Sequence, residues 1–499
     1  MKNIDGFFIN NGLNKILDDG IVSFHMPGHK NGKLYNKLNY FNILEKLYRT
    51  DTTEIPGTDN LHSPEGIIKE SILNAEKTFE SGKTYYLING STCGIEAAIM
   101  AMCDPKEKLI MSRDSHQSSV NACILGDIAP IYIKSKIDKY TNIQRGNSFE
   151  DVKKTIDENK DARVLFLTYP TYYGITFELE KMINYAHSKG IIVVIDEAHG
   201  AHLGLSEKLP KTALQCGADI VIQSTHKTLP AFTQSSMMHI SKAAIENGSV
   251  DTDRIEKMLK MTETSSPSYI LMQSLEIAVE IYNRYGKELM EELIKNIDEF
   301  KRRIEKIKEN YKTKNLLNNR NLEFFNIYNE NDLTKIFVSS LEVGLTGYEF
   351  EEILREEHKI QVELSNYSGV LLITTIGNEK EDFEKMENAL VEIYEKSLFE
   401  EKEKIEPVDY PYDIIPEMIV SPRTAFYSRN KKNVKIEDAV GMICGENIVP
   451  YPPGVCMIAA GEKIPQEIMD YLKYCKNKGM EITGVKDSNF EYIQVIDNI

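Results

Sequence analysis

Apolar and polar residues alternate in blocks between residues 84 and 224, and the blocks predict a sheet alternating with helices. Apolar runs rich in β-branched residues occupy residues 84–88, 108–112, 129–133, 163–169, 191–196 and 219–224. Amphipathic helical segments separate most of them, such as EDVKKTIDEN and ELEKMINYAHSKG. This pattern is typical of a largely parallel sheet with both faces covered. Ligands of such sheets bind at the carboxyl ends of strands, where Asp196, Thr171 and Ser224 are expected to converge.

The same pattern divides the 499 residues into an arm and three units. Residues 1–40 predict an ordered N-terminal arm, and residues 41–270 predict the large α/β domain. Long charged helices over 274–311 and the strands KIFVSS and GVLLITT predict a smaller α/β domain over 271–400. A charged linker near 398–408 leads to a C-terminal α+β domain over 408–499, with a YPPG turn and a last strand IQVID. Several domains are expected, because a chain of this length exceeds one ordinary core.

Composition narrows the function classes. The chain has 76 acidic and 59 basic residues, a net charge of −17, which opposes binding to nucleic acid. The excess of acidic residues favours solubility, or mildly favours the approach of a small cationic ligand. Seven cysteines lie without CxxC spacing, no secretory segment opens the chain, and no apolar run could span a bilayer. These features predict a cytoplasmic protein.

Ser224-Thr225-His226-Lys227 is the strongest local signal for chemistry. Lys227 directly follows an apolar strand, and a buried lysine of lowered pKa can form a Schiff base with an aldehyde. Taken alone, a lysine in this position is better explained as extending from the strand end toward solvent. Asp196, which ends the apolar run IIVVID, could alone be a helix cap or a core ion-pair partner, since a buried carboxylate requires pairing. Together they fit pyridoxal 5′-phosphate (PLP), which needs a lysine and an acid for its pyridine nitrogen.

The turn NGSTCG, between a predicted strand and helix, is a candidate phosphate site that includes Ser91, Thr92 and Cys93. Backbone N–H groups and the helix dipole would face the anion, although many such turns only cap helices. P-loop spacing fails, and no GxGxxG follows a strand. His116, in DSHQSS, could lie against an aromatic cofactor or cap a helix. His199 and His202 are three residues apart, but no HExxH or cysteine partner accompanies them, so no metal is expected.

Several motifs together resemble the bacterial Orn/Lys/Arg decarboxylase family. They are HMPGHKNG, TEIPGTDNLHSPEG, NGSTCG, DSHQS, DEAHG, STHK and the late YPPG with a following GE. The resemblance runs from about residue 20 to near the C-terminus. It implies the aspartate-aminotransferase-like fold (fold type I of PLP enzymes) and the shorter form of the family, without an N-terminal wing domain or the decamer that the wing mediates.

The resemblance also implies residue roles around a PLP ring. Lys227 would hold the cofactor as an internal aldimine, and Asp196 would bind the pyridinium. His116 would stack on one ring face and Ala198 would pack on the other. His199 stands where the long enzymes usually have Trp.

Further roles concern the phosphate and the substrate. The implied phosphate ligands are Ser91 and Thr92, with Ser224 and His226, and neighbouring Cys93 is a further candidate for cofactor binding. Thr264 and Ser265, in TSSPSY, would reach the partner subunit's site. Glu462, in the GE after YPPG, would bind the distal cation of the substrate. The implied assembly is a homodimer, or a dimer-based oligomer, with active sites at the subunit interface.

The implied reaction is α-decarboxylation of a basic amino acid in polyamine biosynthesis. Arginine, giving agmatine and CO2, is the first choice, and lysine or ornithine is the alternative. Either Lys227 or His226 would return a proton to Cα. An aminotransferase or lyase of the same fold is a second hypothesis, which product analysis would distinguish. A silent PLP-like module is a third, and intact Lys227 and Asp196 argue against it.

Overall fold

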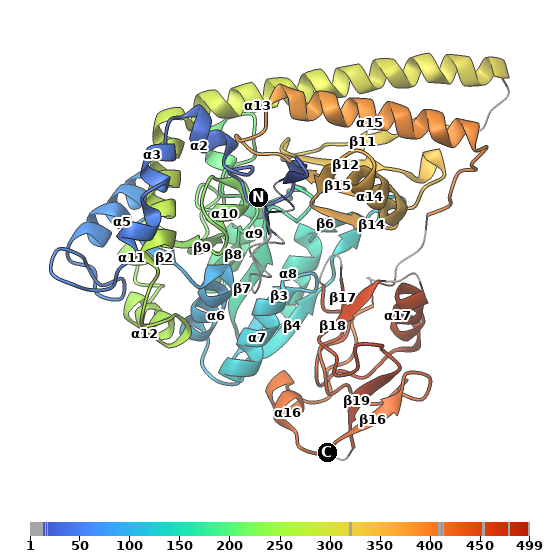
Figure 1. Ribbon diagram of the computed structural model, residues 1–499. Coiled ribbons are helices and arrows are strands. Elements are labelled where there is room, and N and C mark those ends of the chain that lie inside the picture. Colours follow the sequence, from blue (N-terminus) through green and yellow to red (C-terminus); the bar gives the residue numbers. More distant parts are fainter. Residues whose placement is uncertain are drawn as a thin grey trace, which may run out of the picture.

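A seven-stranded sheet forms the centre of the large domain (Figure 1). The computed structural model describes residues 13–14, 16, 18–318, 322–407, 411, 414–451, 455–477 and 480–497. In the order β2-β10-β9-β8-β7-β3-β4, the strands are β2 (Lys83–Leu87), β10 (Ser236–Ile240), β9 (Ile220–Gln223), β8 (Ile192–Asp196), β7 (Ala162–Thr168), β3 (Lys108–Ser112) and β4 (Ala129–Ile133). β10 runs antiparallel to the other six strands of this sheet.

The six strands predicted from the apolar runs are confirmed, each within one residue at either end. The strand that the pattern missed is β10, whose sequence SMMHI has a single β-branched residue. It is nevertheless fully buried, and it joins β2 to the parallel strands. The mostly parallel sheet expected from the sequence therefore carries one internal antiparallel strand.

Successive side chains of each strand pack on opposite faces of this sheet. On β8, Ile192 and Val194 belong to the apolar cluster formed with α6 (Gly90–Met102), α7 (Gln117–Gly126) and α12 (Thr252–Thr262). Val193 and Ile195 belong to the cluster on the other face, with α5 (Ile67–Thr78), α8 (Phe149–Glu158) and α9 (Leu179–Ser188). Both faces are covered, which explains why the strands read as continuous apolar runs.

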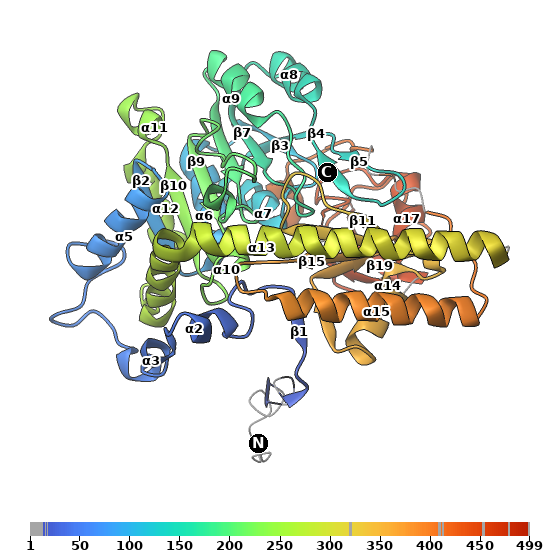
Figure 2. The ribbon, with the colours of Figure 1, turned by 90° about the horizontal axis from the view of Figure 1, so that it is seen from above.

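The small domain packs a four-stranded antiparallel sheet against two long helices. Its strands, in the order β11-β12-β15-β14, are β11 (Asn326–Tyr328), β12 (Lys335–Ser339), β15 (Gly369–Ile373) and β14 (Leu364–Asn366). The charged segment predicted as helices over 274–311 belongs to one 50-residue helix, α13 (Tyr269–Asn318). Figures 1 and 2 show α13 beside α15 (Lys380–Phe399), and α14 (Gly347–Glu356) completes this domain.

Shorter elements connect these parts. The N-terminal segment contributes β1 (Val22–Phe24), which pairs in parallel with β13 (Ile360–Val362) and so joins the small domain. The remaining short elements are α2 (Lys33–Lys37), α3 (Phe41–Leu44), α4 (Leu47–Thr50), β5 (Lys136–Ile137), β6 (Gln144–Gly146), α10 (Thr225–Thr228), α11 (Lys242–Glu246) and the 3-10 turns Leu203–Leu205 and Leu341–Val343.

The C-terminal unit has an apolar cluster of its own, which includes Ile458, Ile468 and Val495. It contains α16 (Pro422–Tyr427), α17 (Gln466–Asn477) and two antiparallel strand pairs, β16 (Lys431–Lys435) with β19 (Tyr492–Ile496) and β17 (Val449–Tyr451) with β18 (Glu481–Thr483). The predicted last strand is β19, while residues 452–454 of the YPPG turn lie outside the described residues. Across all the described parts of the chain, no helix has the length and apolarity that a bilayer crossing requires.

Candidate active site

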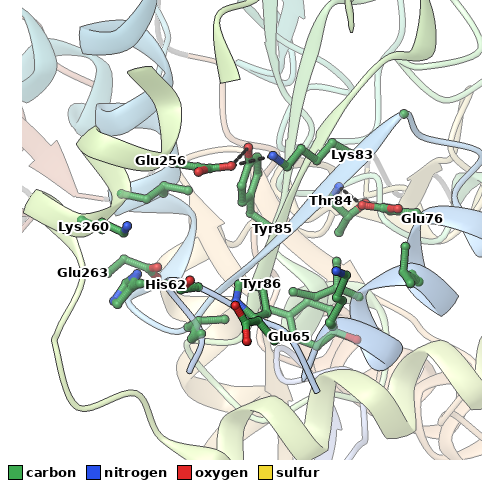
Figure 3. A pocket seen from close by; sticks show the side chains of 18 residues that line it. His62, Glu65, Glu76, Lys83, Thr84, Tyr85, Tyr86, Glu256, Lys260 and Glu263 are labelled. Atoms are coloured by element: carbon green, nitrogen blue, oxygen red, sulfur yellow. Dashed lines mark hydrogen bonds and ion pairs between the residues drawn. The ribbon is translucent and has the colours of Figure 1, made fainter. Parts of the chain in front are cut away.

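Of two cavities beside the large sheet, the smaller contains the side chains that are suited to catalysis. The larger, about 580 Å³, lies between α5, β2 and α12 (Figure 3) and includes neither Lys227 nor Asp196. The smaller, about 350 Å³, lies at the carboxyl ends of the parallel strands, and its volume suits a small organic ligand. Its walls include the predicted residues Ser91, Thr92, His116, Thr171, Asp196, Ala198, His199, Ser224, His226 and Lys227.

Asp196 and Lys227 reach this cavity from adjacent strands. Asp196 is the last residue of β8 and is 3% exposed, with its Oδ1 accepting the Ala198 backbone N–H at 3.0 Å. Lys227 lies in the short helix α10, directly after β9, and its Nζ is 3.0 Å from His199 Nε2. Among the described residues, no cation forms an ion pair with the Asp196 carboxylate. Its position therefore suits a positively charged ring nitrogen.

Enclosure in the cavity shifts the pKa values of both groups toward their neutral forms. Burial raises the pKa of Asp196, against the opposing effect of Lys227 and His116. Burial lowers the pKa of Lys227, against the opposing charges of Asp196 and Glu363. A lysine of lowered pKa presents more of the free amine, which is the form that attacks an aldehyde. The site thus supplies a nucleophilic amine and an acid within one cavity.

His116 has both of the roles that the sequence left open. It caps the N-terminus of α7, where its Nδ1 accepts the Ser118 backbone N–H at 3.2 Å. Its ring also lines the cavity, and burial lowers its pKa, so the ring is a neutral surface for a flat ligand. The helix cap fixes the direction in which the ring faces.

The anion-binding part of the cavity joins the start of α6 to the end of β9. Ser91 Oγ and Ser224 Oγ are 2.7 Å apart, and Gly90 begins α6 with φ +81°, a conformation that favours glycine. Thr92 lies on the same open side of the first turn. Two adjacent hydroxyls at the N-terminus of a 13-residue helix are suited to a phosphate.

Cys93 departs from its predicted role. Its side chain is buried, 3.0 Å from the Gly90 carbonyl and 3.5 Å from Glu263, and does not line the cavity. A residue two positions after Ser91 on a helix points to a different face, so the thiol turns away from the anion site.

His199 and His202 serve different parts of the molecule. The His199 ring lies in the cavity wall, with its centroid 4.2 Å from that of Tyr172. His202 Nε2 lies 3.0 Å from Asp332 Oδ1, in a buried cluster that also contains Thr334 and Lys335. The two histidines therefore do not converge on a shared ligand.

Glu462 is placed differently from the sequence-based expectation. Its carboxylate is 0% exposed and both oxygens accept from Arg113, at 2.6 and 2.8 Å. The residue does not line the cavity. The structure therefore contradicts a role as the free acid for a substrate cation, because the charge of the carboxylate is already neutralised.

Thr264 and Ser265 are exposed and lie outside the cavity of their own chain. The Thr264 carbonyl oxygen lies 2.9 Å from His62 Nε2, so this segment packs against the loop before α5. Their predicted contact with a partner subunit's site stays a prediction.

The structure adds residues that the sequence did not single out. Tyr172 and Thr168 line the cavity from the end of β7, where the strand-end pattern could have indicated them. Val455 lines it from the C-terminal unit. Glu363, from the small domain, accepts the Tyr172 hydroxyl at 2.5 Å and the Met26 N–H at 3.0 Å. No local motif marks Val455, which reaches the cavity through tertiary packing, or Glu363, which does not line the cavity but accepts from Tyr172 in its wall.

A parallel sheet with a lysine and an acid at adjacent strand ends defines the class of fold-type I PLP-dependent enzymes, and solved structures agree. Lysine decarboxylase A from Pseudomonas aeruginosa superposes with a TM-score of 0.77, covering 95% of this chain and 78% of that one, at 18% identity. The family model "Orn/Lys/Arg decarboxylase, major domain" matches residues 9–342, and the model of the C-terminal domain of the same family matches residues 408–488. The chain belongs to the Orn/Lys/Arg decarboxylase family.

Two curated relatives differ in their similarity to this chain. Arginine decarboxylase from Bacillus subtilis is 33% identical over 486 residues, covering 97% of this chain and 96% of its own length. Inducible lysine decarboxylase from Escherichia coli is 22% identical over 552 residues, covering 93% of this chain and 76% of its own length. The fold class, the enzyme class and the family expected from the motifs are thereby confirmed.

Proposed function

We propose that this protein uses PLP to decarboxylate L-arginine to agmatine and CO2, in the cytoplasm, as a step of polyamine biosynthesis. One observation carries the proposal: Lys227 and Asp196 enter the same cavity from adjacent strand ends, with a hydroxyl pair beside them for a phosphate. Arginine is favoured over lysine or ornithine because the similarity to the Bacillus subtilis arginine decarboxylase extends over nearly the full length of both chains.

The residues present fit PLP in charge and in shape. Lys227 would bind the aldehyde, Asp196 the ring nitrogen, and Ser91 with Ser224 the phosphate, with Thr92 and His226 beside it. His116 and Ala198 would face the two sides of the ring. When bound, the cofactor supplies an electron sink for the carbon from which CO2 departs.

Hydrogen bonding distinguishes the two candidate proton donors. His226 Nδ1 donates to the Ser235 carbonyl oxygen at 3.0 Å, and burial lowers the His226 pKa to about 4. Near neutral pH the proton of this ring is held at Nδ1, and Nε2 has none to give. Lys227 Nζ lies inside the cavity and is the group that we assign to return a proton to Cα.

A carboxylate from the small domain is suited to the substrate's distal cation. Glu363 is half-buried, and its negative charge acts on both Lys227 and His226. Its hydrogen bond from Tyr172, which lines the cavity, places it next to the site. We therefore assign to Glu363 the role that the sequence gave to Glu462.

We further propose a homodimer in which Thr264 and Ser265 contact the partner's site. Both residues are exposed on a loop held against the segment that leads into α5, which leaves them available to a second copy. Sedimentation of the wild type and of the Thr264→Arg/Ser265→Arg variant would test this. A monomeric wild type would refute the proposed assembly.

One assay tests the proposed reaction. Purified protein is incubated with PLP and, separately, with arginine, lysine and ornithine, and both CO2 and the amine product are measured. Agmatine formation with the highest kcat/KM is expected. A keto acid in place of CO2 would indicate the aminotransferase, and preferred release of cadaverine or putrescine would overturn the choice of arginine.

A further inference from the structure

Five buried polar side chains form a continuous hydrogen-bonded series across the sheet, next to the candidate active site. Its members are Glu197, Gln223, His239, Thr84 and Ser81, and each is at most 4% exposed. Gln223 Nε2 donates to Glu197 at 2.6 Å, and His239 Nε2 lies 3.2 Å from Gln223 Oε1. Thr84 Oγ1 lies 2.9 Å from His239 Nδ1 and 2.8 Å from Ser81 Oγ. The series therefore links the segment directly after β8 with β9, β10 and β2.

One arrangement of hydrogens satisfies the whole series. Both Glu197 oxygens accept, one from Gln223 and the other from the Ala213 backbone N–H at 2.6 Å. With its amide nitrogen facing Glu197, Gln223 presents its oxygen to His239, which must then carry its proton on Nε2. His239 Nδ1 accepts from Thr84, and Thr84 accepts from Ser81. Burial lowers the His239 pKa to about 3, so the ring is neutral as this arrangement requires.

Two members of the series adjoin active-site residues in the chain, and a third lies in the strand that precedes the phosphate turn. Glu197 lies in the chain between Asp196 and Ala198, and Gln223 directly precedes Ser224. Thr84 lies near the amino end of β2 and pairs with His239 across the strands, while the carboxyl end of β2 leads to the Gly90–Ser91 turn. Thr84 also lines the larger cavity, where it lies next to Glu76 (Figure 3). The series thus connects the strand ends that carry the ring-nitrogen acid and the lysine segment to β2, the strand that precedes the phosphate turn.

Burial of these polar side chains costs free energy of folding. Glu197 is fully buried, and burial raises its pKa to about 8. No described residue forms an ion pair with it, so hydrogen bonds alone stabilise its charged form. Buried polar networks specify one geometry when every member is satisfied, and an apolar replacement would pack at lower cost. Because the series lies beside the candidate active site, we infer that the geometry it fixes is that of the site.

We propose that Glu197, Gln223, His239 and Thr84 are positioning residues that hold the Asp196 carboxylate and the phosphate turn in register with each other. This inference rests on the proposed PLP chemistry. None of the four lines the cavity at the candidate active site, so they act through the backbone segments to which they belong. An error in the direction of Asp196 would change the protonation of the ring nitrogen and hence the spectrum and the turnover.

Gln223→Leu is the first test, because it removes the central donor and acceptor together. In the protein loaded with PLP, we expect kcat for arginine to fall at least tenfold while KM changes less than twofold. The pH at which the visible absorbance of the bound cofactor titrates should also shift by at least half a unit. Thr84→Val, which removes one hydroxyl at the far end, should give the same changes in smaller measure.

The exchange variant Glu197→Gln/Gln223→Glu separates the effect of the geometry of the series on the site from its effect on the stability of the protein. The new amide at position 197 would accept from Ala213 and donate to the new carboxylate at position 223. That carboxyl group would in turn accept from His239, so every hydrogen bond is restored with the carboxyl group one strand away. We expect the exchange to recover the titration of the cofactor spectrum and most of kcat. Met182→Ala, on α9 and away from the site, supplies a control that lowers the melting temperature without moving the spectrum.

Two outcomes would overturn the inference. One is an unchanged spectrum and kcat in both Gln223→Leu and Thr84→Val. The other is an exchange variant that melts like the wild type but stays as impaired as Gln223→Leu. A wild type that binds PLP but releases no amine would instead refute the proposed function, and the spectral titration and cofactor affinity of the variants would still test the network.

Discussion

Arg113 donates to both carboxylate oxygens of Glu462, at 2.6 and 2.8 Å, across the contact between the large domain and the C-terminal unit. Its Nη2 also donates to the Met457 carbonyl oxygen at 2.7 Å. Three residues after Arg113, His116 forms a β-bridge with Val455, which lines the cavity. The ion pair therefore fixes the C-terminal unit against the segment that carries His116 into the site.

Removing one charge from this pair should destabilise the protein without weakening substrate binding directly. We expect Glu462→Gln to cost about 3–5 kcal/mol of stability, because the buried Arg113 loses its counter-charge. KM for arginine should change less than threefold. The double variant Arg113→Met/Glu462→Leu, which buries no charge, should regain much of the melting temperature. A large rise in KM at an unchanged melting temperature would restore the role that the sequence gave to Glu462.

Asp196 should matter more for turnover than for cofactor retention. In Asp196→Ala the ring nitrogen loses its acid and is no longer held protonated, so the electron sink weakens. We expect the variant to keep a visible cofactor spectrum and to lose at least a hundredfold in kcat. Absorbance and CO2 release from the same preparation measure the two effects. Full activity in Asp196→Ala would show that another group holds the nitrogen.

The charges around Lys227 predict a pH dependence with opposite signs for two variants. The Lys227 amine reacts with PLP as the free base, so the rate of reconstitution should rise with pH through the Lys227 pKa, which lies below the ordinary lysine value. Buried Lys335 lowers that pKa, so Lys335→Met should move the midpoint upward. Glu363 raises the pKa, so Glu363→Gln should move the midpoint downward.

Stopped-flow absorbance of the apoprotein mixed with PLP measures this midpoint. The two variants each neutralise one charge and serve as controls for each other. Glu363→Gln should in addition raise KM for arginine more than it changes cofactor affinity. Shifts in the same direction for both variants would exclude an electrostatic origin, and an unchanged KM would exclude Glu363 as the partner of the substrate cation.

Much of the fold was predictable because the large sheet is encoded locally. Strands buried on both faces must be apolar at successive positions, so six of the seven strands are visible as apolar runs. β10 was not predicted because its central residues, Met238 and His239, have no strong strand preference, and its burial depends on neighbours that are distant in the sequence. Likewise, nothing in the charged segment after residue 270 specifies that it continues as one helix to Asn318.

The candidate site likewise combines residues that the sequence predicted with residues that it did not. Asp196 and Lys227 were predictable because the carboxyl ends of adjacent parallel strands meet at one edge of a sheet. Glu462 was misassigned because its partner, Arg113, lies 349 residues earlier and no local pattern links the two. Cys93 was grouped with the hydroxyls of its turn, although the helical rotation turns its thiol inward. Local patterns predict which residues lie at a strand end, while tertiary packing decides which charges remain free.

The hydroxyl pair at the start of α6 should determine the affinity for the phosphate of the cofactor. A hydrogen bond to a charged group is worth about 1.5–3 kcal/mol, so Ser91→Ala and Ser224→Ala should each raise the Kd for PLP by about ten- to a hundredfold. The double variant should show less than the sum of the two effects, because the two oxygens are 2.7 Å apart and would share one ligand. Cys93→Ser is the matched control in the same turn: its side chain faces away from the cavity, so the Kd should stay within about twofold, a change of about 0.4 kcal/mol. Fluorescence titration of the apoprotein measures all four proteins. If Cys93→Ser weakened binding as much as Ser91→Ala, the anion would contact the inner face of the turn and the assignment of the two hydroxyls would fail.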